Sequence, residues 1–240
     1  MARLKNNSMY NSWKSAKNRS TFSRPAAICN GKKLIKGARI LDYGCGQGGD
    51  VFRWREMGYQ AIGFDPYWSP ELPGGGDCFS TVTCFYVLNV IPSVLERLDV
   101  LRRAWDYCSD RLIIANITGG ATLISGDRYF VEFSTWDLKR LIIYSVRKIP
   151  QFIESGLYVV DRSFPDVRLY TWQKSVEAID QIRSDQPIAN DGDYLSSDRG
   201  RIVYYRGDGR RFTVKPKDLE IYKSAIERRD RIRDIQLCTF

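Results

Sequence analysis

The residues best placed to do chemistry surround a glycine-rich turn in the first quarter of the chain. The turn Gly44-Cys45-Gly46-Gln47-Gly48-Gly49 follows a short apolar run that ends in Asp42, and a second short run over 61–64 ends in Asp65. Glycines let a backbone approach a ligand closely, and an acid at the tip of the second strand accepts hydrogen bonds from ribose hydroxyls. The pattern predicts a nucleotide-like cofactor at the carboxyl ends of a parallel sheet.

Two cofactors fit this pattern. Gly44, Gly46 and Gly49 match G-x-G-x-x-G, and Asp65 lies at the distance expected of a ribose acid, so NAD is a formal match. Asp42 favours S-adenosylmethionine, because NAD has no need of a carboxylate beside its pyrophosphate, whereas S-adenosylmethionine carries an ammonium and a sulfonium and no phosphate. The structural alternative is a turn that only lets strand and helix pack closely. We expect S-adenosylmethionine to be bound by Asp42, Gly44, Cys45, Gly46, Gln47, Asp65, Pro66 and Tyr67.

The elements that position this turn can be read from the surrounding pattern. A helix is expected over 50–57, and residues 66–76 form a Pro- and Gly-rich loop in which Tyr67 or Trp68 stacks near the adenine. The next strand, about 80–88, begins too soon after Asp65 to leave room for both the helix and the strand that a standard Rossmann-like sheet places there. We therefore expect the sheet to be truncated at that edge.

Tyr86 and Asn89 are the catalytic candidates, because they follow the central strand at its carboxyl end, where α/β sites lie. Asn89 either holds a polar atom of the substrate or cofactor, or bonds the backbone and shapes the strand-to-helix turn. Ser93 and Glu96 form a capping box that starts the next helix.

The remaining elements are expected in chain order. A strand over 111–116 precedes an irregular lid or substrate loop over 118–133, and Ser134 or Thr135 caps a helix to about residue 146. Alternating runs over 156–160 and 167–172 predict a hairpin that forms the antiparallel final pair of the sheet. Further on we expect a short helix over 176–183, a polar linker over 184–200, a hairpin around Asp208-Gly209 and a charged helix from Pro216 to about residue 235.

The first 37 residues form a basic arm. They hold nine Lys and Arg and no acid, while the whole chain has a net charge of +9, so the positive excess lies here. Tyr10, Trp13 and Phe22 are interleaved with these charges, as in segments that track a nucleic-acid backbone and stack on bases. Lys17 and Arg24 are the substrate-contact candidates. A solvated tail, or a segment that covers the cofactor cleft, is the alternative.

Composition excludes several other classes. The chain has no histidine, and its six cysteines form no C-x-x-C pair, so Ser-His and Cys-His couples and the usual zinc fingers are excluded and no metal site is expected. Its apolar runs are too short to span a bilayer, and its start lacks a signal-peptide core. We expect no membrane association and a reduced, cytoplasmic setting.

The motifs resemble one family of enzymes. N-R-S-T-F-S-R-P, I-L-D-Y-G-C-G-Q-G-G-D-V, G-F-D-P-Y and Y-V-L-N-V-I-P, over about 19–172, resemble the S-adenosylmethionine-dependent methyltransferases found in bacteriophages and beside bacterial DNA phosphorothioation genes. The resemblance implies cofactor binding by Asp42, Gly44, Gly46 and Asp65, with Asn89 lining the site. If a phage encodes the chain, the expected location is the host cytoplasm. Members usually carry an acid near the start of the Y-V-L-N strand, where this chain has Ser80.

Together these observations predict an α/β fold of the class I methyltransferase (Rossmann-like) type: a mostly parallel sheet, truncated at one edge, with an antiparallel hairpin. We expect a basic arm (1–37), a methyltransferase domain (38–174) and a small α+β extension (175–240). The extension is a candidate surface for contact with a protein complex. The expected function is methyl transfer to nucleic acid. A catalytically inactive module of the same fold and, less favoured, an NAD-dependent oxidoreductase are the alternatives.

Overall fold

The computed structural model describes residues 12–74, 76–119, 121–125, 128–167, 174, 188–189, 193–198, 201–206 and 210–237. The chain separates into two compact units, Met1–Val167 and Arg168–Phe240. The domain boundaries expected after residues 37 and 174 stay predictions. No helix in the described ranges has both the length and the apolar character needed to cross a membrane.

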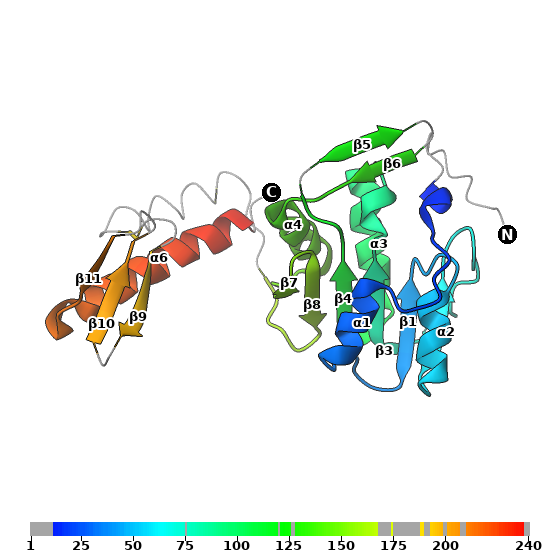
Figure 1. Cartoon of the computed structure of the whole chain (residues 1–240), viewed down its shortest axis with the longest axis horizontal. Coiled ribbons are helices and arrows are strands. Elements are labelled where there is room, and N and C mark those ends of the chain that lie inside the picture. Colours follow the sequence, from blue (N-terminus) through cyan, green and yellow to red (C-terminus); the bar gives the residue numbers. More distant parts are fainter. Residues whose placement is uncertain are drawn as a thin grey trace. The chain divides into compact units, whose positions relative to one another are not determined.

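The first unit alternates strands and helices along the chain (Figure 1). Its helices are η1 (Ser12–Ser15), α1 (Arg24–Gly31), α2 (Gly49–Glu56), η2 (Leu88–Val90), α3 (Val94–Asp106) and α4 (Thr135–Val146). Its strands are β1 (Arg39–Tyr43), β2 (Gln60–Phe64), β3 (Phe79–Phe85), β4 (Cys108–Ala115), β5 (Thr122–Ser125), β6 (Arg128–Val131), β7 (Gln151–Glu154) and β8 (Leu157–Asp161).

One sheet organises this unit, in the order β2-β1-β3-β4-β8-β7. Strands β1 to β4 are parallel, β8 is antiparallel to β4, and β7 is antiparallel to β8. The predicted fold class is therefore confirmed: a mostly parallel, Rossmann-like sheet that ends in an antiparallel hairpin. Its first strand, β2, is an edge, as the short gap after Asp65 indicated.

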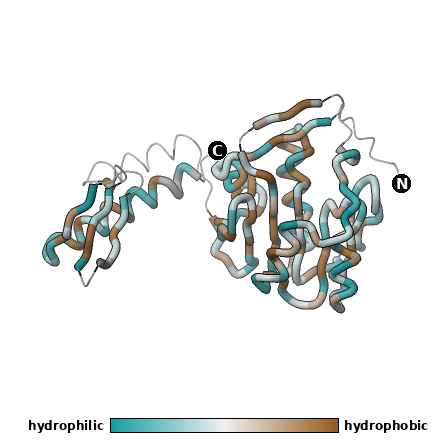
Figure 2. Tube along the Cα trace, in the orientation of Figure 1, coloured by the Kyte–Doolittle hydropathy of each residue, from teal (hydrophilic) through white to brown (hydrophobic). Residues whose placement is uncertain are grey.

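Helices cover both faces of this sheet, because the side chains of the strands alternate between two cores. Ile113, Ala115 and Val159 pack with α1 and α2, whereas Leu112, Ile114 and Tyr158 pack with α3 and α4. Hydrophobic segments accordingly follow the central strands in Figure 2. The result is a three-layer arrangement that leaves the carboxyl ends of the parallel strands free to carry a site.

Two helices begin where the sequence indicated. Ser93 Oγ accepts from the Glu96 N–H at the start of α3 (3.3 Å), and Ser134 Oγ accepts from the Asp137 N–H at the start of α4 (3.0 Å). Each hydroxyl satisfies a backbone donor that the first helical turn leaves without a partner.

Two expectations for this unit are wrong in detail. Strand β8 does pair in a hairpin, but its partner is the preceding β7, through a tight turn at Ser155-Gly156 where Gly156 has φ +75°. Of the expected partner run over 167–172, only Val167 lies within the described residues. The segment 118–133 is not irregular, because β5 and β6 pair antiparallel within it.

The edge strand β2 has its outward carbonyls capped by side chains. Arg55 Nε donates to the Ala61 carbonyl at 2.7 Å, and Ser69 Oγ donates to the Gly63 carbonyl at 3.0 Å. These bonds satisfy acceptors that a further strand would otherwise use.

The second unit contains β9 (Tyr194–Asp198), β10 (Arg201–Tyr205), β11 (Arg211–Thr213), η3 (Pro216–Asp218) and α6 (Leu219–Leu237). The predicted hairpin (β10–β11) and the helix after Pro216 are confirmed, and Tyr222 of α6 packs on Tyr204 of β10, with ring centroids 4.8 Å apart. The linker expected over 184–200 is wrong where β9 pairs with β10. The short helix expected over 176–183 lies outside the described residues.

Candidate cofactor site

The glycine-rich turn lies between the ends of β1 and β2. The N–H groups of Gly44 and Cys45 both donate to the Phe64 carbonyl, at 2.7 and 3.0 Å. Gly44 has φ +88°, and a Cβ built there would stand 2.2 Å from Val87 Cγ2. Only glycine fits this position, since it has neither a side chain to clash nor a strong preference for negative φ.

Asp65 holds the turn and the following loop together. Its Oδ2 accepts from the Gly46 N–H (3.1 Å), and its Oδ1 accepts from the N–H groups of Tyr67 (2.9 Å) and Trp68 (3.0 Å). A carboxylate offers about four acceptor positions, so these bonds leave room for one ribose hydroxyl. The sequence placed the acid correctly at the end of β2 but gave no sign of these backbone bonds.

Asp42 is a buried acid at the end of β1. Its Oδ1 accepts from Thr83 Oγ1 at 2.7 Å, and only 4% of the residue is exposed. Burial raises the pKa of this carboxyl to about 7, with further upward contributions from Asp50 and Asp65, while the Thr83 hydroxyl opposes the shift. A nearby cation would favour the ionised form.

The other predicted cofactor residues lie in or beside the turn. The Cys45 Sγ donates to the Gly46 carbonyl, and burial raises the pKa of this thiol to about 12, so it stays protonated at neutral pH. Gln47 is exposed, and Pro66 lies exposed in the turn that Asp65 holds.

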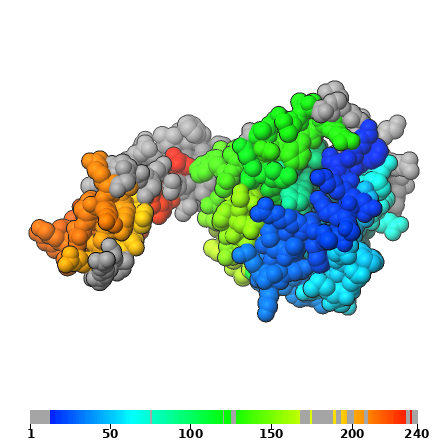
Figure 3. Space-filling view, in the orientation of Figure 1, coloured from blue at the N-terminus to red at the C-terminus, as the bar shows by residue number. Residues whose placement is uncertain are grey.

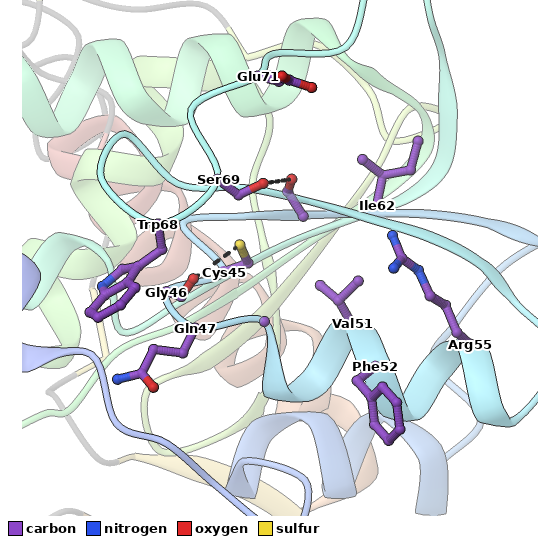
Figure 4. Close-up of a pocket in the computed structure, with 12 residues that line it drawn as sticks. Cys45, Gly46, Gln47, Val51, Phe52, Arg55, Ile62, Trp68, Ser69 and Glu71 are labelled. Atoms are coloured by element: carbon purple, nitrogen blue, oxygen red, sulfur yellow. Dashed lines mark hydrogen bonds between the residues drawn. The ribbon is translucent and has the colours of Figure 1, made fainter.

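A cavity of about 560 Å³ opens on the outer side of the turn, at the truncated edge (Figure 4). It is lined by Cys45 to Gly48 of the turn, by Val51, Phe52 and Arg55 of α2, by Ile62 and Gly63 of β2, and by Trp68, Ser69 and Glu71 of the following loop. Three of the predicted cofactor residues, Cys45, Gly46 and Gln47, thus reach this cavity. The other predicted cofactor residues do not line it: Asp42, Gly44, Asp65, Pro66 and Tyr67. Neither of the catalytic candidates, Tyr86 and Asn89, lines it.

The N-terminal arm covers the inner part of the turn. Gln47 Nε2 donates to the Ala16 carbonyl at 3.2 Å, and a Cβ built on Gly46 would stand 3.0 Å from Ala16 Cβ. Trp13 stacks on Tyr67, with ring centroids 4.3 Å apart and 6° between the ring planes. In Figure 3 the blue arm lies across the unit between the green β5–β6 hairpin and the cyan segment that follows β2.

Farther along, the arm is fastened to the fold. Ser23 is buried, and its N–H and Oγ donate to the two carboxylate oxygens of Asp50 at 2.7 and 2.6 Å. Pro25, Ala26 and Cys29 of α1 are buried, and Ala26 and Cys29 belong to the core on that face of the sheet. The two candidate substrate contacts remain at the surface: Lys17 is exposed, and the Arg24 side chain is 79% exposed while it pairs with Glu154 at 3.3 Å.

Tyr86 lies directly after β3 in a left-handed backbone conformation, with φ +61°. This conformation is energetically unfavourable for residues other than glycine, and such strained residues are enriched at functional sites. Burial raises the pKa of its hydroxyl, while Arg19 and Arg24 lower it. The arm's arginines therefore influence the carboxyl end of β3, but the phenol remains protonated at neutral pH.

Asn89 and Asn116 are buried amides with opposite surroundings. The Asn89 Nδ2 donates to the carbonyls of Ile117 and Val131, and its Oδ1 accepts from the Ile117 N–H at 3.1 Å. Of the two roles that the sequence left open for Asn89, this geometry supports the structural one. Asn116, just after β4, is 4% exposed, and among the described residues neither amide atom of its side chain has a hydrogen-bond partner.

Several residues that matter here gave only weak signals in the sequence. Thr83 and Asp42 meet because the register pairs β1 with β3, and Asn116 could have been noted as a polar residue ending an apolar strand. Among the described residues no group of three or more Cys, Asp or Glu side chains could hold a metal ion.

The donors and acceptors present fit S-adenosylmethionine. A carboxylate at the end of β2 has room for a ribose hydroxyl, an acid at the end of β1 can take an ammonium, and the Tyr67 ring already accepts a planar bicyclic partner in Trp13. Because η1 and Ala16 lie over the same turn, the cofactor can bind there only if this part of the arm moves away.

Comparisons with solved structures find distant similarity to methyltransferases. A 1,6-didemethyltoxoflavin-N1-methyltransferase of Burkholderia thailandensis, with bound 1,6-didemethyltoxoflavin and S-adenosylhomocysteine (SAH), matches with 18% identity over 60% of this chain and 78% of its own, at a TM-score of 0.46. A magnesium protoporphyrin IX methyltransferase of Synechocystis PCC 6803, with bound SAH, matches with 16% identity over 63% and 93%, at 0.44. No model of a protein family and no curated protein matches the chain. The function proposed below therefore rests on this chain's own residues.

Proposed function

We propose that the first unit is an S-adenosylmethionine-dependent methyltransferase. The observation that carries this is the pair of acids on either side of the glycine turn, Asp42 buried at the end of β1 and Asp65 at the end of β2. An acid at the first position suits an ammonium and not a pyrophosphate, which argues against NAD.

In this proposal the chain's residues bind and orient, and the cofactor supplies an already activated methyl group. Asp65 takes a ribose hydroxyl, Asp42 takes the ammonium in its ionised form, and Gly44 and Gly46 allow close approach of the backbone. Positioning of the acceptor in line with the methyl group can supply much of the rate acceleration. We assign Tyr86 to the acceptor, because it directly follows β3 at the carboxyl end of the sheet and has a strained backbone, with φ +61°.

We infer that the acceptor is nucleic acid, on the strength of the arm's charge. Lys14, Lys17, Arg24, Lys32 and Lys33 are exposed cations on a segment without acids. Trp13 is engaged with Tyr67, so in this state the cations and not the ring would contact a polyanion. The phage or phosphorothioation setting, the cytoplasmic location and a protein partner for the second unit stay predictions.

The cofactor is tested by calorimetric titration of the full chain with S-adenosylmethionine, SAH and NAD in parallel. Micromolar binding of the first two alone supports the proposal. Binding of NAD alone would replace it with the oxidoreductase alternative.

The acceptor is tested by fluorescence anisotropy with labelled single-stranded DNA at several salt concentrations. For single strands, each lost phosphate contact should flatten the slope of log K against log salt by about 0.7. We expect this of Lys17→Gln and Arg24→Gln. Arg102→Gln on α3, which covers the other face of the sheet, is the charge-matched control. Equal slopes in all three variants would contradict the arm's role.

A catalytically inactive module is the second candidate, favoured by one observation. Asn89, one of the two catalytic candidates, uses its side-chain amide to bond backbone groups, and the arm lies over the glycine turn. Incorporation of labelled methyl into DNA, RNA or protein acceptors distinguishes the two. Cofactor binding without incorporation into any of them would favour the module.

A further inference from the structure

Residues 12–16 of the arm lie over the glycine turn and contact the segments on both sides of it. Element η1 lies against β6 on one side, and its Trp13 stacks on Tyr67 on the other. Between them, Ala16 accepts from Gln47 and approaches Gly46 closely. Figure 1 places η1 and the β5–β6 hairpin beyond the ends to which the arrowheads of β1 and β4 point, which is the side where α/β folds bind ligands.

The Trp13 indole lies where the base of a nucleoside cofactor would be expected. Tyr67 is held to the ribose acid itself, because its N–H donates to Asp65 Oδ1 at 2.9 Å. A base attached to a ribose at Asp65 would reach this ring, and purine and indole are both planar bicyclic groups that stack on an aromatic face. Trp68 also contacts Trp13, with the two ring centroids 6.4 Å apart in an edge-to-face arrangement.

We propose that Trp13 and the adenine of the cofactor compete for the same face of Tyr67, so that cofactor binding displaces η1 from the glycine turn. This inference rests on the proposed function. It makes the arm a cover that lowers the apparent affinity, since only the fraction of molecules with η1 displaced can bind. Ala16 adds to the cover, because its methyl group stands close to Gly46, where the cofactor's backbone contacts are expected.

The competition is tested by titrating SAH into the full chain and three variants, with calorimetry as the readout. Trp13→Ala removes the stacked ring and should tighten SAH binding by about two- to tenfold, the range of one aromatic pair. Trp13→Phe keeps a smaller ring and should lie between. Trp136→Ala on α4 removes another partly exposed tryptophan and should bind as the unaltered chain does.

A second readout follows the arm directly. In the unaltered chain, SAH should increase the quenching of tryptophan fluorescence by acrylamide, because Trp13 leaves Tyr67. In Trp13→Ala this increase should vanish. Trp13 lies outside both buried cores, so the variant is expected to fold, and its unfolding midpoint serves as the check.

The outcomes separate this inference from the proposed function. Equal SAH binding by Trp13→Ala would mean that the arm has no effect on the cofactor, and weaker binding would mean that the arm closes on the base as a lid. Either result would overturn displacement while leaving the cofactor site intact. Failure of all four chains to bind SAH would overturn the proposed function, and the inference with it.

Discussion

At the scale of single residues, Asp65 holds the glycine turn and the following loop together, and we propose that it also binds the ribose. Asp65→Ala should weaken SAH binding by about 1.5–3 kcal/mol, the scale of lost charged hydrogen bonds. Calorimetry measures this, with Asp65→Asn as the matched variant, because its amide oxygen can still accept from the Tyr67 and Trp68 N–H groups. Unchanged affinity in Asp65→Ala would mean that the ribose acid has been misplaced.

Asp42 gives a pH-dependent prediction. Its pKa is raised from 3.8 to about 7 in the folded state, so the unfolded chain loses this proton first as the pH rises. Its contribution to the free energy of unfolding is therefore complete below about pH 4 and falls by at most about 1.4 kcal/mol per pH unit until about pH 7. Urea titrations should show Asp42→Asn gaining stability relative to the unaltered chain over this window. If the free energies of unfolding of the two chains changed with pH in parallel, the raised pKa of Asp42 would be contradicted.

The two acids were predictable because each directly ends an apolar run, and the glycines between them mark the turn. Their partners were not. Thr83 reaches Asp42 only through the pairing of β1 with β3, and the Asp65 bonds depend on how the loop folds back. Sequence spacing carries no information on such register-dependent contacts.

At the scale of elements, Asn89 ties η2 to both ends of the β5–β6 segment, at Ile117 and Val131. Asn89→Ala should lower the free energy of unfolding by about 1–3 kcal/mol, because it removes the hydrogen bonds that this fully buried amide makes to the Ile117 N–H and the Val131 carbonyl. Asn116→Leu is the matched change at the end of the neighbouring strand. It removes an amide that has no partner among the described residues, and should be neutral or stabilising. Chemical denaturation measures both, and equal losses would refute the contrast.

The elements themselves were largely predictable, and the errors have physical causes. The central strands are continuous apolar runs, and serine caps mark α3 and α4. Strand β7 escaped notice because it is only four residues long and half polar (QFIE), so β8 seemed to pair forward along the chain. Strand β9 (YLSSD) has too few apolar residues to alternate.

At the scale of the whole molecule, the candidate site belongs to the first unit. Both buried cores of that unit, and every residue assigned to the site, precede Val167. A chain ending at Val167 should therefore unfold cooperatively and bind SAH as the full chain does, as measured by urea denaturation and calorimetry. A loss of SAH affinity with cooperative unfolding intact would show that the second unit contributes to the site.

The capped edge of β2 has a consequence for the molecule in a crowded cell. An exposed edge strand invites the sheets of neighbouring copies to join it, and β2 is the edge of this sheet. The bonds from Arg55 and Ser69 to the Ala61 and Gly63 carbonyls occupy the acceptors that such joining requires. The bonds from Arg55 and Ser69 thus protect this edge against aggregation, and the loss of Arg55 should be seen as turbidity.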